Sequence, residues 1–335
     1  MTRVVTFGEV MMRLSPPSFQ RFTQSSNFDI TYGGGEANVA IGLSQWGVET
    51  SHITAFPTDD LGKAAFAYLN KNNVGTQYIR FLPGRLGLYF LEKGASVRAS
   101  KIVYDREFSS FSKAQPADYD WKMILKDAAV FHWTGITPAL SESAASACFE
   151  AIRAARELGV KVCGDITFRK NLWKYGKTAR EVLSEMIHYC NYINCGESEA
   201  YELFGISSGT GHEPYRSYSQ QLLQKFDQLE LVIGTKRETI NASHNSLSGF
   251  IHSTHGFFET QQFHIVPIVD RIGGGDALMA GFIYGLLQGW DEQKIISFAT
   301  AASVLKHSVE GDSLIASVEE VAQLVRGESV GRLVR

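Results

Sequence analysis

Short runs of β-branched and aromatic residues alternate along this chain with longer stretches in which apolar residues recur at helical spacing. Helical stretches begin near Glu36, Ser141 and Ala179, each after a strand-like run. These three runs are RVVTFGEV (3–10), AAVFHWTG (128–135) and VKVCGDI (160–166). The order strand, helix, strand, helix predicts a mostly parallel sheet covered by helices on both faces. Ligands of such a sheet bind at the carboxyl ends of its strands.

The same alternation continues elsewhere in the sequence. TSHITAF (50–56) precedes a helix from about Asp60, and NYINCG (191–196) precedes one from about Glu197. LELVIGT (229–235) closes the series before a β-rich stretch at 238–269. We therefore expect a single α/β domain over residues 1–335, because no repeat, low-complexity tract or proline-rich linker divides the chain.

Two segments, 11–31 and 77–112, depart from this rhythm. TQYIRFL, GLYFLEK and KIVYDRE follow one another as strand-like runs without helices between them. We expect the two segments to form a small separate β-sheet that acts as a lid over the carboxyl ends of the main strands. An antiparallel extension of the edge of the main sheet is the alternative.

The most distinctive motif is Asp270-Arg-Ile-Gly-Gly-Gly-Asp276, which leads directly into the apolar stretch ALMAGFIYGLLQG. Glycines at the start of a helix allow unpaired backbone N–H groups to converge on an anion, which the helix dipole also favours. The Asp276 carboxylate would lie beside that anion and could take a proton from an attacking hydroxyl. A glycine-rich turn with an aspartate N-cap is the structural alternative.

A second glycine motif, Tyr32-Gly-Gly-Gly-Glu-Ala-Asn38, also leads into a helix. Its open backbone, with the Asn38 amide one turn inside the helix, suits a hydroxylated ligand. Close helix packing would also require glycines here. A dinucleotide fingerprint fits less well, because Asn38 stands in the place of its third glycine.

These two motifs, in this order and about 240 residues apart, resemble those of the ribokinase-like carbohydrate kinases over nearly the whole chain. The resemblance implies a ribokinase-like three-layer α/β/α fold and transfer of phosphate from ATP, with Mg²⁺, to a sugar. It also implies that Gly34, Gly35 and Asn38 bind the sugar. Asp276 would be the catalytic base, and the anion hole would consist of Gly273, Gly274 and Gly275.

Three further segments carry the resemblance to the nucleotide and metal site. Asp165-Ile-Thr-Phe-Arg169 is similar to the family's D-x-N-x-R segment, with Thr167 in the place of Asn. Gly196-Glu-Ser-Glu199 keeps the Glu of the magnesium-linked N-x-x-E motif, and Thr235-Lys-Arg237 replaces the glycines of a nucleotide segment. The resemblance implies that Glu199 holds the metal. The implied nucleotide contacts are Thr167, Thr235, Arg237, Gly273 and Gly275.

Within the family, GEVMMRL, GGGEAN, Tyr104-Asp-Arg106 and DRIGGGDA are most similar to 2-keto-3-deoxygluconate kinases. The resemblance implies sugar-acid contacts from Gly34, Tyr89, Tyr104, Arg106 and Arg169, and hydroxyl contacts from Asp312. Two arginines in one pocket suit a carboxylate, which guanidinium groups bind bidentately. Surface ion pairs of both arginines are the structural alternative. A kinase of a neutral sugar such as fructose or ribose, or a non-catalytic sugar sensor, remains the alternative function.

Composition and charge exclude several other classes. The 335 residues carry a formal net charge of -3 without a run of like charges, so nucleic acid and anionic membranes are not expected partners. Glu9 interrupts the N-terminal apolar run before a signal peptide could form, and four cysteines are too few for a disulfide framework. We expect a cytoplasmic protein that forms a dimer or higher oligomer through its lid.

Two other enzyme motifs are matched only in part. A P-loop ending at Gly176-Lys177-Thr178 would require glycine at position 171, which is Asn171. Gly205-Ile-Ser-Ser-Gly209 has the letters of a serine-hydrolase elbow, but it follows a helical stretch rather than a strand. The P-loop is therefore rejected, and a serine hydrolase is only weakly supported.

Overall fold

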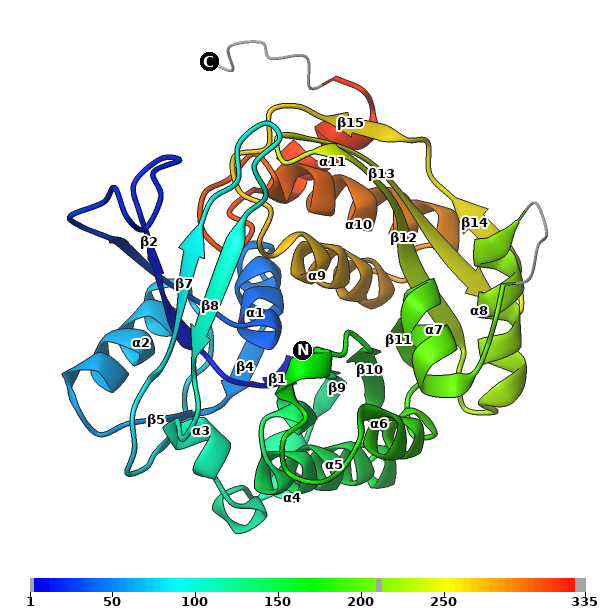
Figure 1. Ribbon diagram of the computed structural model, residues 1–335. Helices are drawn as coiled ribbons and strands as arrows, with labels where there is room; N and C mark the ends of the chain where they lie inside the picture. Colours follow the sequence, from blue (N-terminus) through cyan, green and yellow to red (C-terminus); the bar gives the residue numbers. More distant parts are fainter. Residues whose placement is uncertain (1–2, 209–212, 329–335) are drawn as a thin grey trace.

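A large, mostly parallel β-sheet forms the centre of the protein (Figure 1). The computed structural model describes residues 3–208 and 213–328. In this part of the chain the sheet has nine strands in the order β14-β13-β12-β11-β10-β9-β1-β4, with β15 paired to β13. The pairs from β4 to β12 are parallel, and β13, β14 and β15 are antiparallel additions. The bounds are β1 (Arg3–Phe7), β4 (Thr50–Ile53), β9 (Ala128–Thr134), β10 (Lys161–Asp165), β11 (Tyr192–Asn194), β12 (Leu231–Asn241), β13 (His244–Ser253), β14 (Gly256–Glu259) and β15 (Phe263–Ile265).

Helices cover both faces of this sheet, as the alternation of strands and helices predicts. Successive strand residues point to opposite faces, so Val4 packs into one core and Val5 into the other. The first face is covered by α1 (Gly35–Gln45), α9 (Gly274–Leu287), α10 (Glu292–Lys306) and α11 (Val318–Val325). The second face is covered by α3 (Ser110–Lys113), α4 (Trp121–Leu125), α5 (Glu142–Glu157), α6 (Ala179–Ile187), α7 (Glu197–Phe204) and α8 (Pro214–Lys225). Short 3₁₀ turns, η1 (Pro116–Asp118), η2 (Thr137–Ala139) and η3 (Lys170–Leu172), lie in the connections.

A second, four-stranded sheet lies beside the main one (Figure 1). Its order is β3-β2-β7-β8, with bounds β3 (Asp29–Gly33), β2 (Met11–Ser15), β7 (Gly87–Glu92) and β8 (Lys101–Asp105). Met12 of this sheet packs into a core shared with α1 and with α2 (Asp60–Lys71). The expected small separate sheet is therefore confirmed.

Two details differ from the expectations. Part of the TQYIRFL run forms β6 (Arg80–Phe81), which pairs in parallel with β5 (Ala55–Phe56) rather than with the small sheet. The Phe81 ring lies 5.6 Å from that of Phe66 on α2, so aromatic packing holds this run away from the small sheet. In addition, β12 does not end near Thr235 but continues as a hairpin with β13 to Asn241.

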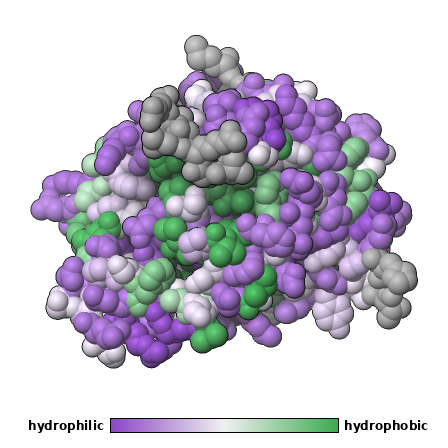
Figure 2. Space-filling model, turned by 90° about the horizontal axis from the view of Figure 1, so that it is seen from above, coloured by the Kyte–Doolittle hydropathy of each residue, from purple (hydrophilic) through white to green (hydrophobic). Residues whose placement is uncertain are grey.

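The molecular surface is predominantly polar on the face seen in Figure 2, where hydrophobic side chains gather toward the middle. Within the described residues, no helix combines the length and the apolar character that crossing a membrane requires.

Candidate active site

The two glycine motifs meet where the N-termini of α1 and α9 approach each other. Asn38 Nδ2, one turn inside α1, donates a hydrogen bond of 2.7 Å to Asp276 Oδ2 in the first turn of α9. A Cβ added at Gly35 would lie 3.5 Å from Asp276 Oδ1. The tertiary structure thus joins residues 238 positions apart, and directs two positive helix ends toward one carboxylate.

The loop at the start of α9 packs closely against other residues at one end and is open at the other. Gly273 is the N-cap and has a φ of 83°, and a Cβ at this position would lie 1.7 Å from the Asp312 carbonyl oxygen. A Cβ at Gly274 would lie 2.8 Å from the His307 ring, whereas one at Gly275 would have no neighbour within 4 Å. Because Gly273 caps the helix, Asp276 is not the N-cap that the structural alternative required. The open side at Gly275 leaves room for a phosphate.

The electrostatic environment of Asp276 suits a proton acceptor that works near neutral pH. Desolvation raises the pKa of this carboxyl from 3.8 to about 7, and the nearby Asp165, Asp312 and Glu36 act in the same direction. The hydrogen bond from Asn38 acts in the opposite direction. A base with a pKa near 7 can both accept a proton from a hydroxyl and release it again.

Glu36 is a buried carboxylate next to this site that sequence reasoning did not single out. Its Oε1 accepts hydrogen bonds from Thr134 N at 3.1 Å, Thr134 Oγ1 at 2.8 Å and Thr137 Oγ1 at 2.7 Å. These bonds tie the start of α1 to the carboxyl end of β9 and to η2. The feature of the sequence that could have indicated this role of Glu36 is its position as an acidic residue inside a glycine motif.

A buried network of charges links the small sheet to the α9 loop. Arg13 of β2 contacts Asp270 Oδ2 at 2.6 Å through Nη2 and Asp312 Oδ1 at 2.7 Å through Nη1. The Tyr89 hydroxyl donates to the other oxygen of Asp312. Asp312 and Tyr89, expected to bind the sugar, thus bond to each other here, and desolvation raises the pKa of both side chains.

The two arginines expected to bind a carboxylate have different surroundings. Arg106, directly after β8, is buried and bonds to Glu9 Oε2 through Nε at 2.7 Å and Nη2 at 2.5 Å. Arg169, after β10, is exposed, and its guanidinium has no hydrogen bond or ion pair within the described residues. The ion pair of Arg106 is therefore a buried one, and no contact joins the two guanidinium groups in the described chain.

The segments that carry these arginines nevertheless lie side by side. Lys174 Nζ contacts Glu107 Oε1 at 2.7 Å, which connects the loop after Arg169 to the residue after Arg106. Tyr104 is 43% exposed, its ring centroid lies 6.0 Å from that of Tyr89, and the Arg106 guanidinium lies 5.7 Å from its centroid. The structure thus brings Tyr89, Tyr104 and Arg106 to one face of the small sheet.

Polar groups gather at the ends of β10 and β11, where the resemblance implies a metal. Asp165 Oδ1 accepts from Thr167 N at 3.1 Å and Thr167 Oγ1 at 2.7 Å, and Asn194 also hydrogen-bonds to Asp165. Glu199, half-buried in the first turn of α7, accepts from Ser198 Oγ at 2.8 Å. No cluster of three or more metal-ligating side chains occurs in the described residues. Mg²⁺ fits this environment, because it commonly binds one or two carboxylates together with substrate phosphates and water.

Two arginines lie near His307, whose ring adjoins the Gly274 position of the α9 loop. Arg237 lies on β12 two residues after Thr235, and its pKa is lowered by desolvation and by the nearby Arg271. The Nε of Arg271 is buried without a hydrogen-bond partner, and its Nη2 reaches the Asn245 amide oxygen at 2.9 Å. Arg237 and Arg271 have no carboxylate partner in the described chain. Arg271 was missed in the sequence although it lies inside the DRIGGGD motif.

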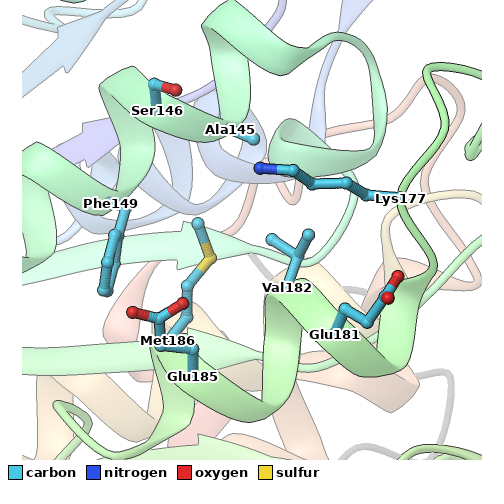
Figure 3. Close-up of a pocket in the computed structure, with 8 residues that line it drawn as sticks. All are labelled: Ala145, Ser146, Phe149, Lys177, Glu181, Val182, Glu185 and Met186. Carbon is cyan, nitrogen blue, oxygen red and sulfur yellow. The ribbon is translucent and has the colours of Figure 1, made fainter.

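A surface pocket elsewhere on the molecule does not belong to this site. It lies between α5 and α6 and is lined by Phe149, Lys177, Glu181 and Met186 among others (Figure 3). Lys177 pairs loosely with Glu142, at 3.8 Å, and Glu181 caps α6. None of the residues that line this pocket belongs to the site around Asp276.

The chain is similar to carbohydrate kinases over nearly its whole length. The family model described as pfkB family carbohydrate kinase matches residues 1–318. The chain is 40% identical to the crystal structure of a 2-dehydro-3-deoxygluconokinase from Thermotoga maritima, with a TM-score of 0.92 and coverage of 97% of this chain and 98% of that one. A PfkB family carbohydrate kinase from Listeria grayi is 37% identical, with a TM-score of 0.92 and coverage of 97% and 100%.

A curated relative points to the same group of enzymes. The chain is 29% identical to a 2-dehydro-3-deoxygalactonokinase from Haloferax volcanii, with 98% of each chain covered. The two solved structures share the α/β fold expected from the sequence. Together with the family match over almost the whole length, they establish that the chain belongs to the pfkB family of carbohydrate kinases.

Proposed function

We propose that this protein transfers the γ-phosphate of ATP to a hydroxyl of a 2-keto-3-deoxy sugar acid, with 2-keto-3-deoxygluconate as its main substrate. The observation that carries the proposal is the position of Asp276 in the first turn of α9, beside the open loop, where burial raises the pKa of its carboxyl to about 7. Phosphoryl transfer requires an anion-stabilising loop and a base beside the attacking hydroxyl. The Thermotoga and Haloferax relatives, named for two such sugar acids, support the choice of substrate class.

Arg169 supports the preference for an acid. Its exposed guanidinium has no carboxylate partner in the described chain, and the Lys174–Glu107 ion pair holds its loop beside the small sheet. We assign Arg169 as the principal contact of the substrate carboxylate, because guanidinium binds carboxylate bidentately. Arg106 is held by Glu9 and acts as a second contact through the edge of its guanidinium that faces away from Glu9.

The ATP phosphates would lie against the α9 loop at its open side, Gly275, with Arg237 and Arg271 near the other end of the loop. Both arginines lack a carboxylate partner in the described residues, and a phosphate would supply the missing acceptor. Glu199 is the proposed residue for Mg²⁺, which would neutralise charge on the transferring phosphate. Thr167 and Thr235 remain proposed nucleotide contacts, and a cytoplasmic location is part of this proposal because ATP is the phosphate donor.

The small sheet is proposed to close over the sugar as a lid made from segments 11–31 and 77–112. Its inner face carries Tyr89 and Tyr104, and its outer face carries a row of apolar side chains that crosses the four strands. The row consists of Ile30, Leu14, Phe90 and Val103, of which Ile30 is 59% and Val103 53% exposed. We propose that two copies pair through this row. Val103→Glu should convert the oligomer to a monomer in analytical ultracentrifugation, whereas an unchanged mass would exclude the row as the interface.

One observation favours a second candidate, a kinase of a neutral sugar. Glu9 neutralises the buried Arg106, so of the two arginines proposed to bind the acid, Arg169 alone is unpaired within the described residues. A panel of 2-keto-3-deoxygluconate, 2-keto-3-deoxygalactonate, fructose and ribose, with ADP release as the readout, separates the two functions. We expect kcat/KM for a sugar acid to exceed that for either neutral sugar. Equal or greater efficiency with fructose or ribose would reject the acid and leave the neutral-sugar kinase.

A further inference from the structure

Lys306, the last residue of α10, is the one lysine that lies fully buried among the described residues. None of the proposed steps of catalysis uses it. Its ammonium forms no ion pair with a carboxylate in the described chain and donates instead to two backbone carbonyls, Val309 O at 2.9 Å and Asp270 O at 3.4 Å. An ammonium in such a position is costly to bury, and desolvation lowers its pKa. The groups around this ammonium therefore have to offset the cost of burying it.

The two carbonyls belong to the segments that build the anion-binding loop. Asp270 begins the loop, and Val309 lies in the segment leading to Asp312, whose own carbonyl oxygen contacts the Gly273 position. The Lys306 side chain itself lies against the loop, because its Cε would be 3.3 Å from a Cβ at Gly273. One ammonium group thus bonds to both segments directly beneath the N-cap of α9.

The charge count beneath the loop explains why a cation is required there. Asp270 and Asp312 are buried carboxylates that share the single guanidinium of Arg13. With Lys306 the group contains two cations and two anions, and without it the group has a net negative charge below a loop that must attract phosphate. Such a charge would repel the phosphate and oppose ionisation of Asp276, which lies in the same field.

We propose that the Lys306 ammonium acts as a tethered monovalent cation, which fixes the 270–276 loop to the 309–312 segment and balances the Asp270 and Asp312 carboxylates. Lys306 is in this sense a positioning residue. It acts on phosphate through the loop rather than by contact. The protein consequently needs no free monovalent cation at this position, because its own side chain provides one. This inference rests on phosphoryl transfer by the family and does not depend on which sugar is the substrate.

Lys306→Ala tests the proposal, because it leaves a carbonyl-lined space that a small cation can fill. The assay buffer contains tetramethylammonium as its only monovalent cation, and ammonium or potassium chloride is then added. The phosphate acceptor is the sugar that the wild-type enzyme phosphorylates. We expect kcat of the variant to fall about 10-fold or more and to recover saturably with ammonium or potassium. The wild type should be indifferent to both ions. Lys294→Ala, an exposed change of equal charge on the same helix, should behave like the wild type.

A second measurement needs no substrate and so separates this proposal from the proposed function. Ammonium should raise the melting temperature of Lys306→Ala but not that of Lys294→Ala, because a bound cation stabilises the folded state by mass action. If the variant does not fold in tetramethylammonium, recovery of the folded protein on refolding with ammonium is the equivalent readout. The proposal is overturned by full activity of Lys306→Ala without small cations, by a defect that neither ion relieves, or by a wild type that itself requires potassium.

Discussion

Asn38 Nδ2 and Asp276 Oδ2 are joined by a hydrogen bond of 2.7 Å between the first turns of two helices, α1 and α9. Ser313 Oγ donates to the Asn38 amide oxygen at 3.1 Å, so the amide orientation is fixed from both sides. The hydrogen bond from Asn38 lowers the pKa of Asp276. Orientation of the proposed base is thus a second role for Asn38, beside the sugar contact predicted for it.

Replacement of Asp276 with Asn should lower kcat by ~10²-fold or more, the low end for a positioned base. The same change should affect stability in a pH-dependent way. The folded-state pKa of about 7 lies above the ordinary 3.8, so the wild type loses stability as pH rises through 7 and Asp276 ionises. The variant lacks this loss, and its melting temperature relative to the wild type should be higher at pH 8.5 than at pH 5. A constant difference across this range would show that the Asp276 pKa is not raised.

Asn38→Leu should move the acidic limb of the pH profile of kcat/KM to higher pH. Its amide stabilises the ionised form of Asp276, so removal of the hydrogen bond raises the pKa of that carboxyl above about 7. Activity at pH 6 should then fall more than activity at pH 9. Asn70→Leu on the exposed side of α2 is the matched control. If kcat/KM falls equally at all pH values and the acidic limb does not move, the role of Asn38 is limited to sugar binding.

A pair of alanine substitutions distinguishes the supported side of the α9 loop from its open side. Gly273→Ala would place a methyl group 1.7 Å from the Asp312 carbonyl oxygen at a φ of 83°, and it should destabilise the protein by about 2 kcal/mol or more. Gly275→Ala meets no atom within 4 Å and should melt like the wild type. Its methyl group would nevertheless enter the space assigned to phosphate. Kinetics should show a raised KM for ATP or a lower kcat, and normal kinetics of Gly275→Ala would place the phosphate elsewhere.

Arg169→Leu should lower kcat/KM for 2-keto-3-deoxygluconate by ~10²-fold or more, if one charge-assisted bidentate pair contributes about 3 kcal/mol. The effect on fructose or ribose should be much smaller, because a neutral sugar has no carboxylate to lose. Arg153→Leu on α5 is a suitable control, since its guanidinium stacks on Phe149 away from the site. Equal losses with acid and neutral sugars would remove Arg169 from carboxylate recognition.

Arg271→Gln should raise KM for ATP while leaving KM for the sugar nearly unchanged. The guanidinium has a buried Nε without a partner beside the α9 loop, and a phosphate is the acceptor proposed for it. The loss should shrink at high ionic strength, where charge–charge attraction is screened. Arg326→Gln on the surface after α11 provides the comparison. An unchanged KM for ATP in Arg271→Gln would assign this arginine to the Asn245 contact alone.

The sequence by itself determined the layer architecture, the small sheet and the glycine motifs, because these depend on local periodicity and on backbone freedom. The helix beginning after Gly273 and the strand ending at Asp165 could be placed from neighbouring residues alone. The run TQYIRFL was misplaced because the packing of its Phe81 against Phe66 decides that it pairs with β5. The alternation of residues within the run does not contain this information.

Only the tertiary structure decided which charges meet. Arg106 and Arg169 are both arginines near the ends of strands, yet one is buried against Glu9 and the other is exposed. Lys306 ends an apolar helix, and nothing in its neighbours indicates that its ammonium reaches the loop at Asp270. Pairing of charges depends on distances across the fold and on desolvation, and neither is encoded in local sequence pattern.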